Sequence, residues 1–272
     1  MTNSKKRSIP NFILLLFTLS VPFWVFGAIY DIQIFPGFNL YQLSLAMPMV
    51  AALILIYREK GKTGIITLLK RTYDFRNIKP GTWLLPVLLI YPSIGFLDYL
   101  ILRLSGMSIP LPQFSLSIFI GYCTVFFMTY GEELGLTGYA IDPMQERYSA
   151  LKSGILLGCV WAGYHIPIFI INGYYSFWWI FWHAVYTIAV RVLFVWIYNN
   201  SGKSLSSMAL MHWTFGLFWS LWPTENLHKA VSFYDPRICA VIAMIYVTIV
   251  TLLWGAKTLA KYKFTRSFET VT

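Results

Sequence analysis

Charged side chains are scarce in this sequence. Of its 272 residues only 12% are Asp, Glu, Lys or Arg, whereas an average soluble domain has about 25%. This shortage of charge excludes coiled coils and collagen, and an aromatic content of 18% excludes intrinsic disorder. Hydrophobic residues reach 57%, against roughly 45 to 50% in a soluble domain. The composition therefore indicates a protein that crosses the bilayer several times.

Cysteine is also scarce. The three cysteines, Cys123, Cys159 and Cys239, each lie inside an apolar run. They show neither a CxxC spacing nor the spacing of a His/Cys metal site. We interpret them as buried small hydrophobes, and no disulfide framework follows.

Long apolar runs are what the sequence has instead. A membrane-spanning helix needs about 20 apolar residues, and the backbone in lipid must form either a helix or a closed barrel. The runs here are too long and too uninterrupted to show the alternation of barrel strands. The sequence therefore predicts an all-α polytopic membrane protein, with about eight transmembrane helices in one bundle and a single integral domain over residues 1–272. The expected helices are Phe12–Tyr30, Tyr41–Tyr57, Trp83–Leu102, Leu116–Tyr139, Ser153–Ile171, Phe177–Tyr198, Ser204–Trp222 and Arg237–Ala256.

Most of the basic residues lie in the loops between these runs. The formal net charge is +10, but its placement is more informative than its sum. With the N-terminus inside, most Lys and Arg residues fall in inner loops, and the outer side keeps Arg103, Lys229 and Arg237. We expect an integral protein of the plasma membrane with both termini in the cytoplasm. The lipid bilayer is its expected partner, and nucleic acid is not.

The stretch Arg58–Gly81 is the longest segment outside the runs. Its apolar residues beside Lys70 and Arg71 indicate an amphipathic segment on the inner surface. A plain basic loop explains the composition equally well, and both interpretations stay open.

Ionisable side chains inside the runs are functional candidates, because each costs several kcal/mol to insert. Glu132 and Glu133 lie in one run, and His165 and His212 lie in two others. At 1.5 Å per residue, Glu132 and His212 are roughly 10 to 12 Å from the inner boundary and His165 is about 18 Å from it. A carboxylate near two imidazoles can activate water, and imidazole donors can stabilise an oxyanion. Peptide-bond hydrolysis requires both functions. The alternative is that the glutamates only hold the bundle together through polar contacts.

Three motifs carry a resemblance to a known family. A Glu pair, an aromatic residue four positions before a histidine, and a further histidine lie in three separate helices. With these motifs, the chain resembles the CPBP family of intramembrane proteases over roughly Phe114 to Trp222. That family includes the type II CAAX prenyl endopeptidase and the bacterial Abi proteins linked to bacteriocin processing and immunity. The motif residues are Glu132 to Gly138, Trp161 with His165, and His212 with Gly216.

The resemblance implies an intramembrane endopeptidase with its protease core at residues 114–222. Its substrate would be a hydrophobic peptide or a membrane protein. By the same resemblance, Glu132 activates water, Glu133 and His165 position it, and His212 binds the developing oxyanion. No cofactor is expected. A zinc site with Glu132, His165 and His212 as ligands and water as the fourth stays open as the alternative.

The sequence departs from the family pattern at two positions. Thr137 stands where the family has Arg, so a fixed cation beside the glutamates is missing, and Arg147 and Arg191 are the candidates to replace it. Gly216 stands where the family has Asn or Asp. Loss of such a donor can lower the rate about 100-fold. A second hypothesis follows: a catalytically weak or inactive protein of this fold that serves bacteriocin immunity or acts as a binding partner.

Overall fold

The computed structural model describes residues 7–35, 38–78, 82–113, 116–172, 176–219, 221 and 234–260. Within these residues the chain is almost entirely helical, which confirms the all-α prediction. Its strands are the short antiparallel pair β1 (Gln33–Phe35) and β2 (Phe38–Asn39). The helices are α1 (Ile9–Ile29), α2 (Met47–Lys70), α3 (Leu84–Leu104), α4 (Leu116–Glu133), α5 (Asp142–Gln145), α6 (Ala150–Asn172), α7 (Phe177–Asn200), α8 (Leu205–Trp219) and α10 (Pro236–Trp254), with the 3-10 helical segments η1 (Leu40–Ala46) and η2 (Arg71–Asn77) and the π-helical segment η3 (Leu134–Ile141).

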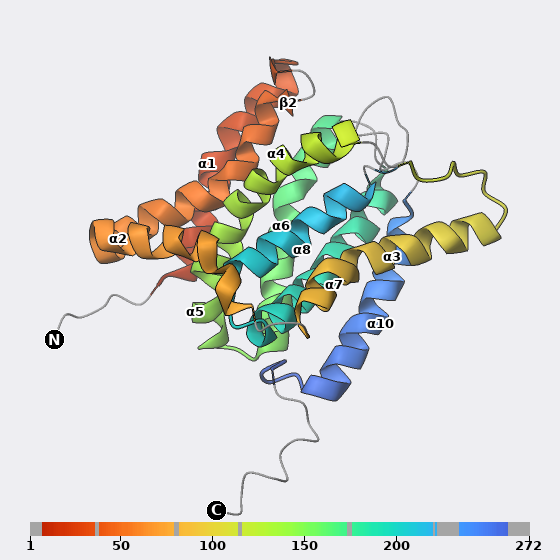
Figure 1. The fold of residues 1–272 in the computed structure, drawn as a ribbon. Helices are drawn as coiled ribbons and strands as arrows, with labels where there is room; N and C mark the ends of the chain where they lie inside the picture. Colours follow the sequence, from red (N-terminus) through yellow and green to blue (C-terminus); the bar gives the residue numbers. More distant parts are fainter. Residues whose placement is uncertain are drawn as a thin grey trace, which may run out of the picture.

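Six helical stretches among the described residues are long and apolar enough to cross a membrane, which confirms a polytopic membrane protein. They comprise α1, the stretch from η1 through α2 to η2, α3, α6, α7 and α10. The helices α4 and α8, with 18 and 15 residues, are not among these six. In Figure 1, α6, α7 and α8 lie at the centre of the bundle, α1 and α2 on one flank, and α3 and α10 on the other. Of the four predicted site residues, His165 lies on α6 and His212 on α8, while Glu132 and Glu133 end α4.

The beginning of α1 and the end of α10 lie at the same face of the bundle. Arg7 donates a hydrogen bond from Nη1 to the carbonyl of Tyr139 at 2.9 Å. The amide of Ala150 donates to the carbonyl of Lys257, also at 2.9 Å. Arg7 before α1 thus contacts η3, and Lys257 after α10 contacts the start of α6. This arrangement agrees with two termini on one side of the membrane, and their cytoplasmic location stays a prediction.

The stretch Arg58–Gly81 is mostly helical where the structure describes it, so its interpretation as a plain loop is wrong. The helix α2 runs on to Lys70 and is kinked at Gly61, whose φ of 63° and ψ of −159° suit only glycine. Beyond the kink one side is buried and the other is not: Leu68 is 3% exposed and Ile66 is 42% exposed. The amphipathic interpretation therefore agrees with the structure up to residue 78, and residues 79–81 lie outside the described part.

The interpretation of the cysteines was correct at one of three positions. Cys239 is buried, whereas Cys123 and Cys159 are exposed on the protein surface. An apolar side chain in a membrane helix can face lipid tails as readily as it faces the protein core. The hydrophobicity of a run therefore does not show whether a cysteine in it faces the lipid or the protein core.

Candidate active site

The two glutamates lie where α4 passes into η3. A π-helical turn is wider than an α-helical one, and such turns occur often at functional sites. The turn is held against the start of α2: a Cβ on Gly135 would lie 2.4 Å from the carbonyl oxygen of Pro48. Only glycine allows this approach of the two backbones. The expected single helix Leu116–Tyr139 is therefore α4 up to Glu133, continued by η3.

Close packing of α6 on α7 brings the second motif to the site. A Cβ on Gly154 would lie 2.9 Å from Cα of Val192, and one on Gly158 would lie 2.8 Å from Cα of Ile188. The two glycines are four residues apart, and this small-xxx-small spacing lets membrane helices approach each other closely. One helical turn after Gly158, Trp161 consequently faces Arg191 of α7.

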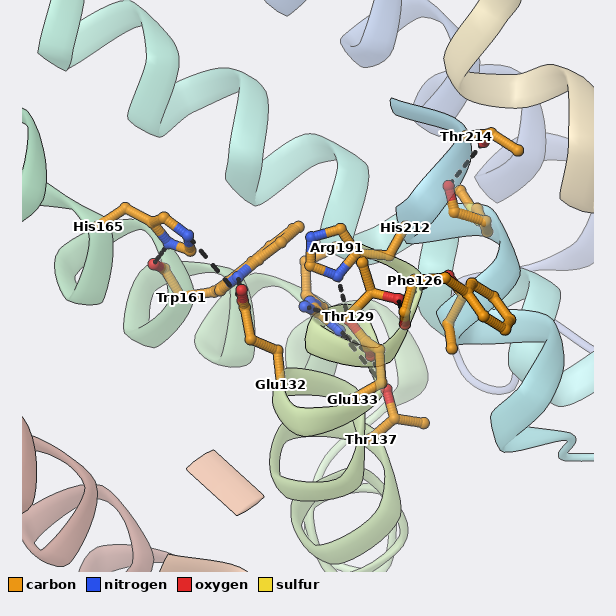
Figure 2. Close-up of polar contacts among 12 residues, drawn as sticks. Phe126, Thr129, Glu132, Glu133, Thr137, Trp161, His165, Arg191, His212 and Thr214 are labelled. Atoms are coloured by element: carbon orange, nitrogen blue, oxygen red, sulfur yellow. Dashed lines mark hydrogen bonds and ion pairs between the residues drawn. The ribbon is translucent and has the colours of Figure 1, made fainter. Parts of the chain in front are cut away.

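Glu133 is sealed inside the bundle and fully hydrogen-bonded (Figure 2). Its Oε2 accepts from Nη1 of Arg191 at 2.9 Å and from the Thr137 hydroxyl at 2.5 Å. Its Oε1 accepts from Nη2 of Arg191 at 3.1 Å and faces Nδ1 of His212 at 3.1 Å. The side chains of Glu133 and Arg191 are both 0% exposed. Since a carboxylate has about four lone-pair sites, Glu133 has no capacity left for a water molecule.

Glu132 points away from this cluster, toward α6. Its Oε2 accepts a hydrogen bond from the Trp161 indole at 2.8 Å and lies 3.9 Å from Nε2 of His165. Among the described residues, Oε1 accepts no hydrogen bond. The His165 side chain is 20% exposed and that of Glu132 is 6% exposed. Of the two carboxylates, Glu132 is thus the one with free acceptor capacity next to a partly open histidine.

The contacts of His165 indicate its tautomer. Its Nδ1 lies 2.9 Å from the carbonyl oxygen of Trp161. A carbonyl oxygen only accepts, so Nδ1 carries the proton and Nε2 of the neutral ring is an acceptor. Nε2 and the Glu132 carboxylate are therefore two acceptors that face the same space, and a water molecule there can donate one proton to each.

Trp161 joins the two groups. Its ring lies edge-on to both histidines, with centroid distances of 5.7 Å to His165 and 5.2 Å to His212. The Arg191 guanidinium lies over the same ring, 4.0 Å from its centroid, in cation–π geometry. One tryptophan thus contacts the cation of the first group and the carboxylate of the second.

The four predicted site residues come together, but in two pairs: Glu132 with His165, and Glu133 with His212. Arg191 provides the charge that Thr137 does not, and Thr137 itself donates to Glu133. Arg147 is exposed and donates to the carbonyl of Arg7, away from the glutamates. Sequence reasoning missed the direct bond from Trp161 to Glu132. The available signal for Arg191 was that it is the one Lys or Arg deep within an expected span.

The position of Gly216 is filled by a neighbouring ring. A Cβ on Gly216 would lie 2.6 Å from Cε1 of Tyr122, and Tyr122 is 8% exposed. The carbonyl of Tyr122 accepts from the Trp213 indole at 2.6 Å, which fixes α4 against α8 at this point. An Asn or Asp at 216 therefore does not fit unless Tyr122 moves.

The three residues of the zinc alternative do not form one cluster in the described part of the chain. Among the described residues, no group of three or more His, Cys, Asp or Glu side chains is placed to hold a metal ion. Glu132 and His165 face each other, while Nδ1 of His212 is bound to Glu133. The three side chains expected as zinc ligands thus belong to two different hydrogen-bonded groups.

A cavity of about 580 Å³ lies elsewhere, between the start of α7 and the start of α10. Its lining combines aromatic side chains, among them Trp178, Trp179 and Trp182, with the charged pair Asp235 and Arg237. None of the four predicted site residues lines it. His183, one turn into α7, lies 2.9 Å from the hydroxyl of Tyr234 and stacks on Trp179, so it belongs to this aromatic cluster.

Membrane-crossing helices around buried acid–imidazole pairs define an integral membrane protein with a polar site suited to hydrolysis. Comparison with known proteins agrees with this class. Residues 114–218 match the family model described as type II CAAX prenyl endopeptidase Rce1-like. The chain is also 27% identical over 242 residues to CAAX prenyl protease 2 of Methanococcus maripaludis, covering 80% of this chain and 86% of that protein. The resemblance to the CAAX endopeptidase family is confirmed, and both matches support an intramembrane endopeptidase in general.

Proposed function

We propose that the protein is an intramembrane endopeptidase in which Glu132 activates water. The observation that carries this proposal is the contrast between two neighbouring carboxylates. Glu133 is sealed and saturated by Arg191, Thr137 and His212. Glu132 keeps an oxygen without a hydrogen bond from the described residues and faces the partly exposed His165. A general base needs this free capacity within reach of a water molecule.

The chemistry follows from the placement of these groups. A water between Glu132 and Nε2 of His165 loses a proton to the carboxylate as its oxygen forms a bond to the scissile carbonyl carbon. The carbonyl oxygen becomes an oxyanion. When the C–N bond breaks, the proton held by Glu132 passes to the leaving amine. The Trp161 indole fixes one carboxylate oxygen throughout, so the base is oriented before the substrate arrives.

His212 is our proposed donor to the oxyanion. Its Nδ1 proton is directed at Glu133, so donation to substrate falls to Nε2 and requires that both ring nitrogens carry protons. The ion pair of Glu133 with Arg191 thus positions His212, and Gly216 contributes no side-chain donor.

We propose that the reaction proceeds without a metal ion, because the two imidazoles belong to separate hydrogen-bonded groups. Activity of the purified protein should then survive dialysis against 1,10-phenanthroline or EDTA. Loss of activity that added zinc restores would contradict this part of the proposal.

The proposed substrate is a hydrophobic or membrane-associated peptide. We place the protease itself in the plasma membrane, with both of its termini in the cytoplasm. The name of the methanococcal relative refers to prenylated CAAX sequences. A quenched fluorogenic CAAX-type peptide, with and without a lipid on its cysteine, is therefore the first probe to use.

The decisive experiment compares three proteins in lipid nanodiscs on these peptides. Glu132→Gln preserves an acceptor for Trp161 but removes the base, and we expect a loss of about 10²- to 10⁴-fold in kcat. Glu146→Gln alters an exposed carboxyl on the short connection before α6 and serves as the matched control. Equal activity of wild type and Glu132→Gln would refute the proposal.

The second candidate function is a catalytically silent binding or immunity protein, and the missing donor at Gly216 favours it. It predicts that Glu132→Gln preserves the cellular phenotype while a packing variant such as Gly158→Leu, which forces α6 from α7, loses it. A phenotype lost in Glu132→Gln alone would reject this candidate.

A further inference from the structure

A second hollow, lined by several polar side chains, lies at the face of the bundle where α1 begins. It has a volume of about 190 Å³ and is lined by Arg7, Lys60 and Arg71, by the hydroxyl-bearing Thr63 and Thr67, and by Ile56, Gly64 and Leu68. None of the site residues described above contributes to it. It combines three cations and two hydroxyl groups, and its lining includes no acidic side chain.

Two of the cations converge on one oxygen atom. Nη1 of Arg7 and Nη1 of Arg71 both donate to the carbonyl of Gly138, at 3.3 Å and 3.1 Å. The two guanidinium groups are consequently within two hydrogen-bond lengths of each other. Like charges this close repel, and the repulsion is costly unless an anion compensates it.

Among the described residues, no carboxylate forms an ion pair with either guanidinium group. Glu59 is nearby but accepts from the hydroxyl of Tyr139 at 2.6 Å, and the Tyr139 ring lies between it and Arg7. The remaining partners of Arg7 and Arg71 are neutral: the carbonyls of Tyr139 and Lys203 and the hydroxyl of Tyr198. Lys60 is exposed and, within the described part of the chain, has no ion pair. The neighbouring Asp142 accepts from Lys203 and from Tyr198, so it is already engaged by other groups.

The kink of α2 forms the hollow. At Gly61 the chain leaves helical geometry with φ at 63°, and the helix resumes in a new direction toward Arg71. The bend places Lys60 before the kink and Thr63 and Thr67 after it around the same space. A Cβ on Gly64 would lie 2.9 Å from the Ile56 side chain, so a larger residue would crowd the floor of the hollow.

We propose that this hollow binds a phosphate group, either of an anionic lipid headgroup or of a soluble phosphate. The N–H groups of a guanidinium can form two parallel hydrogen bonds to phosphate oxygens, and lysine adds a mobile point charge. Basic pockets between membrane helices bind acidic headgroups, and each Lys or Arg near an anionic surface contributes about 1 kcal/mol. The volume admits a phosphate with a few waters but is smaller than the pockets that hold drug-sized ligands.

The test measures binding to the full chain in neutral detergent micelles, so its result does not depend on peptidase activity. The probes are dihexanoyl phosphatidic acid, glycerol 3-phosphate, inorganic phosphate and dihexanoyl phosphatidylcholine, titrated by microscale thermophoresis. We expect saturable binding of at least one of the three anionic probes and none of the zwitterionic lipid. If phosphatidic acid is the one probe that binds, the hollow is a lipid site. If inorganic phosphate displaces phosphatidic acid, the hollow accepts a phosphate group from either source.

Matched lysine variants locate the site. Lys60→Gln should weaken binding about fivefold, as expected for loss of one cation near the phosphate. Lys62→Gln removes a neighbouring exposed lysine that does not line the hollow, and it should bind as the wild type does. Both variants keep the hydrogen bonds of Arg7 and Arg71, so their thermal unfolding should be unchanged. An equal loss of affinity in both variants, or no binding of any anionic probe to the wild type, would overturn the proposal.

Discussion

Arg191 and Glu133 form a two-pronged ion pair between α7 and the end of α4, with N–O distances of 2.9 Å and 3.1 Å and no exposure of either side chain. Thr137 stands where the motif of the family that the sequence resembles has arginine. The charge is supplied instead from another helix, and the threonine hydroxyl becomes a further donor to the same carboxylate.

Removal of the cation should destabilise the bundle strongly. Arg191→Met leaves Glu133 as an unpaired buried charge, and breaking such a pair costs about 3–5 kcal/mol. The double variant Glu133→Leu/Arg191→Met removes both charges and should recover most of the lost stability without recovering activity. The midpoint of thermal unfolding in detergent measures the stability of the single and the double variant. The prediction is wrong if Arg191→Met unfolds at the temperature of the wild type.

The indole of Trp161 should matter for rate more than for folding. Trp161→Phe retains an aromatic face under Arg191 but removes the donor to Glu132. Hydrogen bonds to charged groups contribute about 1.5–3 kcal/mol, so we expect kcat to fall about 10- to 100-fold. Peptide-release kinetics provide the measurement. Trp178→Phe, at a 66% exposed position, is the control and should keep full activity.

Asparagine at position 216 should destabilise the protein unless space is made for its side chain. Gly216→Asn forces a Cβ to within 2.6 Å of the Tyr122 ring, and overpacking of this kind costs about 1–3 kcal/mol. Combining it with Tyr122→Ala removes the ring, so the double variant should be more stable than Tyr122→Ala alone. Unfolding midpoints of the three proteins test this. A fully stable single variant would show that Tyr122 moves aside freely.

The kink of α2 should depend on glycine. At φ 63° and ψ −159°, Gly61 occupies a region that other residues avoid, and we expect Gly61→Ala to cost about 1–3 kcal/mol although its Cβ would meet no neighbour. Gly163→Ala, inside α6 with its nearest contact at 4.0 Å, is the matched control. That change should leave stability equal or slightly higher, because alanine favours helix. Equal unfolding midpoints for the two variants would show that the kink is not strained.

Helix positions were largely accessible from the sequence, because an apolar run longer than the bilayer core has few other structures available. The run Phe177–Tyr198 is α7 to within two residues. The segment after Tyr57 was harder: its composition suits an amphipathic segment and a plain basic loop equally well, and packing of Gly64 and Leu68 makes it helical. Tertiary contacts there outweigh local composition.

The amino-acid sequence alone established a helical membrane protein with two carboxylates and two imidazoles at similar depth, because ionisable groups are too costly in lipid to be placed there without a use. It did not establish which histidine pairs with which glutamate. That pairing depends on the rotation of α4, α6, α7 and α8 about their own axes. Those rotations are set by backbone contacts at Gly135, Gly154 and Gly158 and by the ion pair of Arg191, which exist only when the helices are packed.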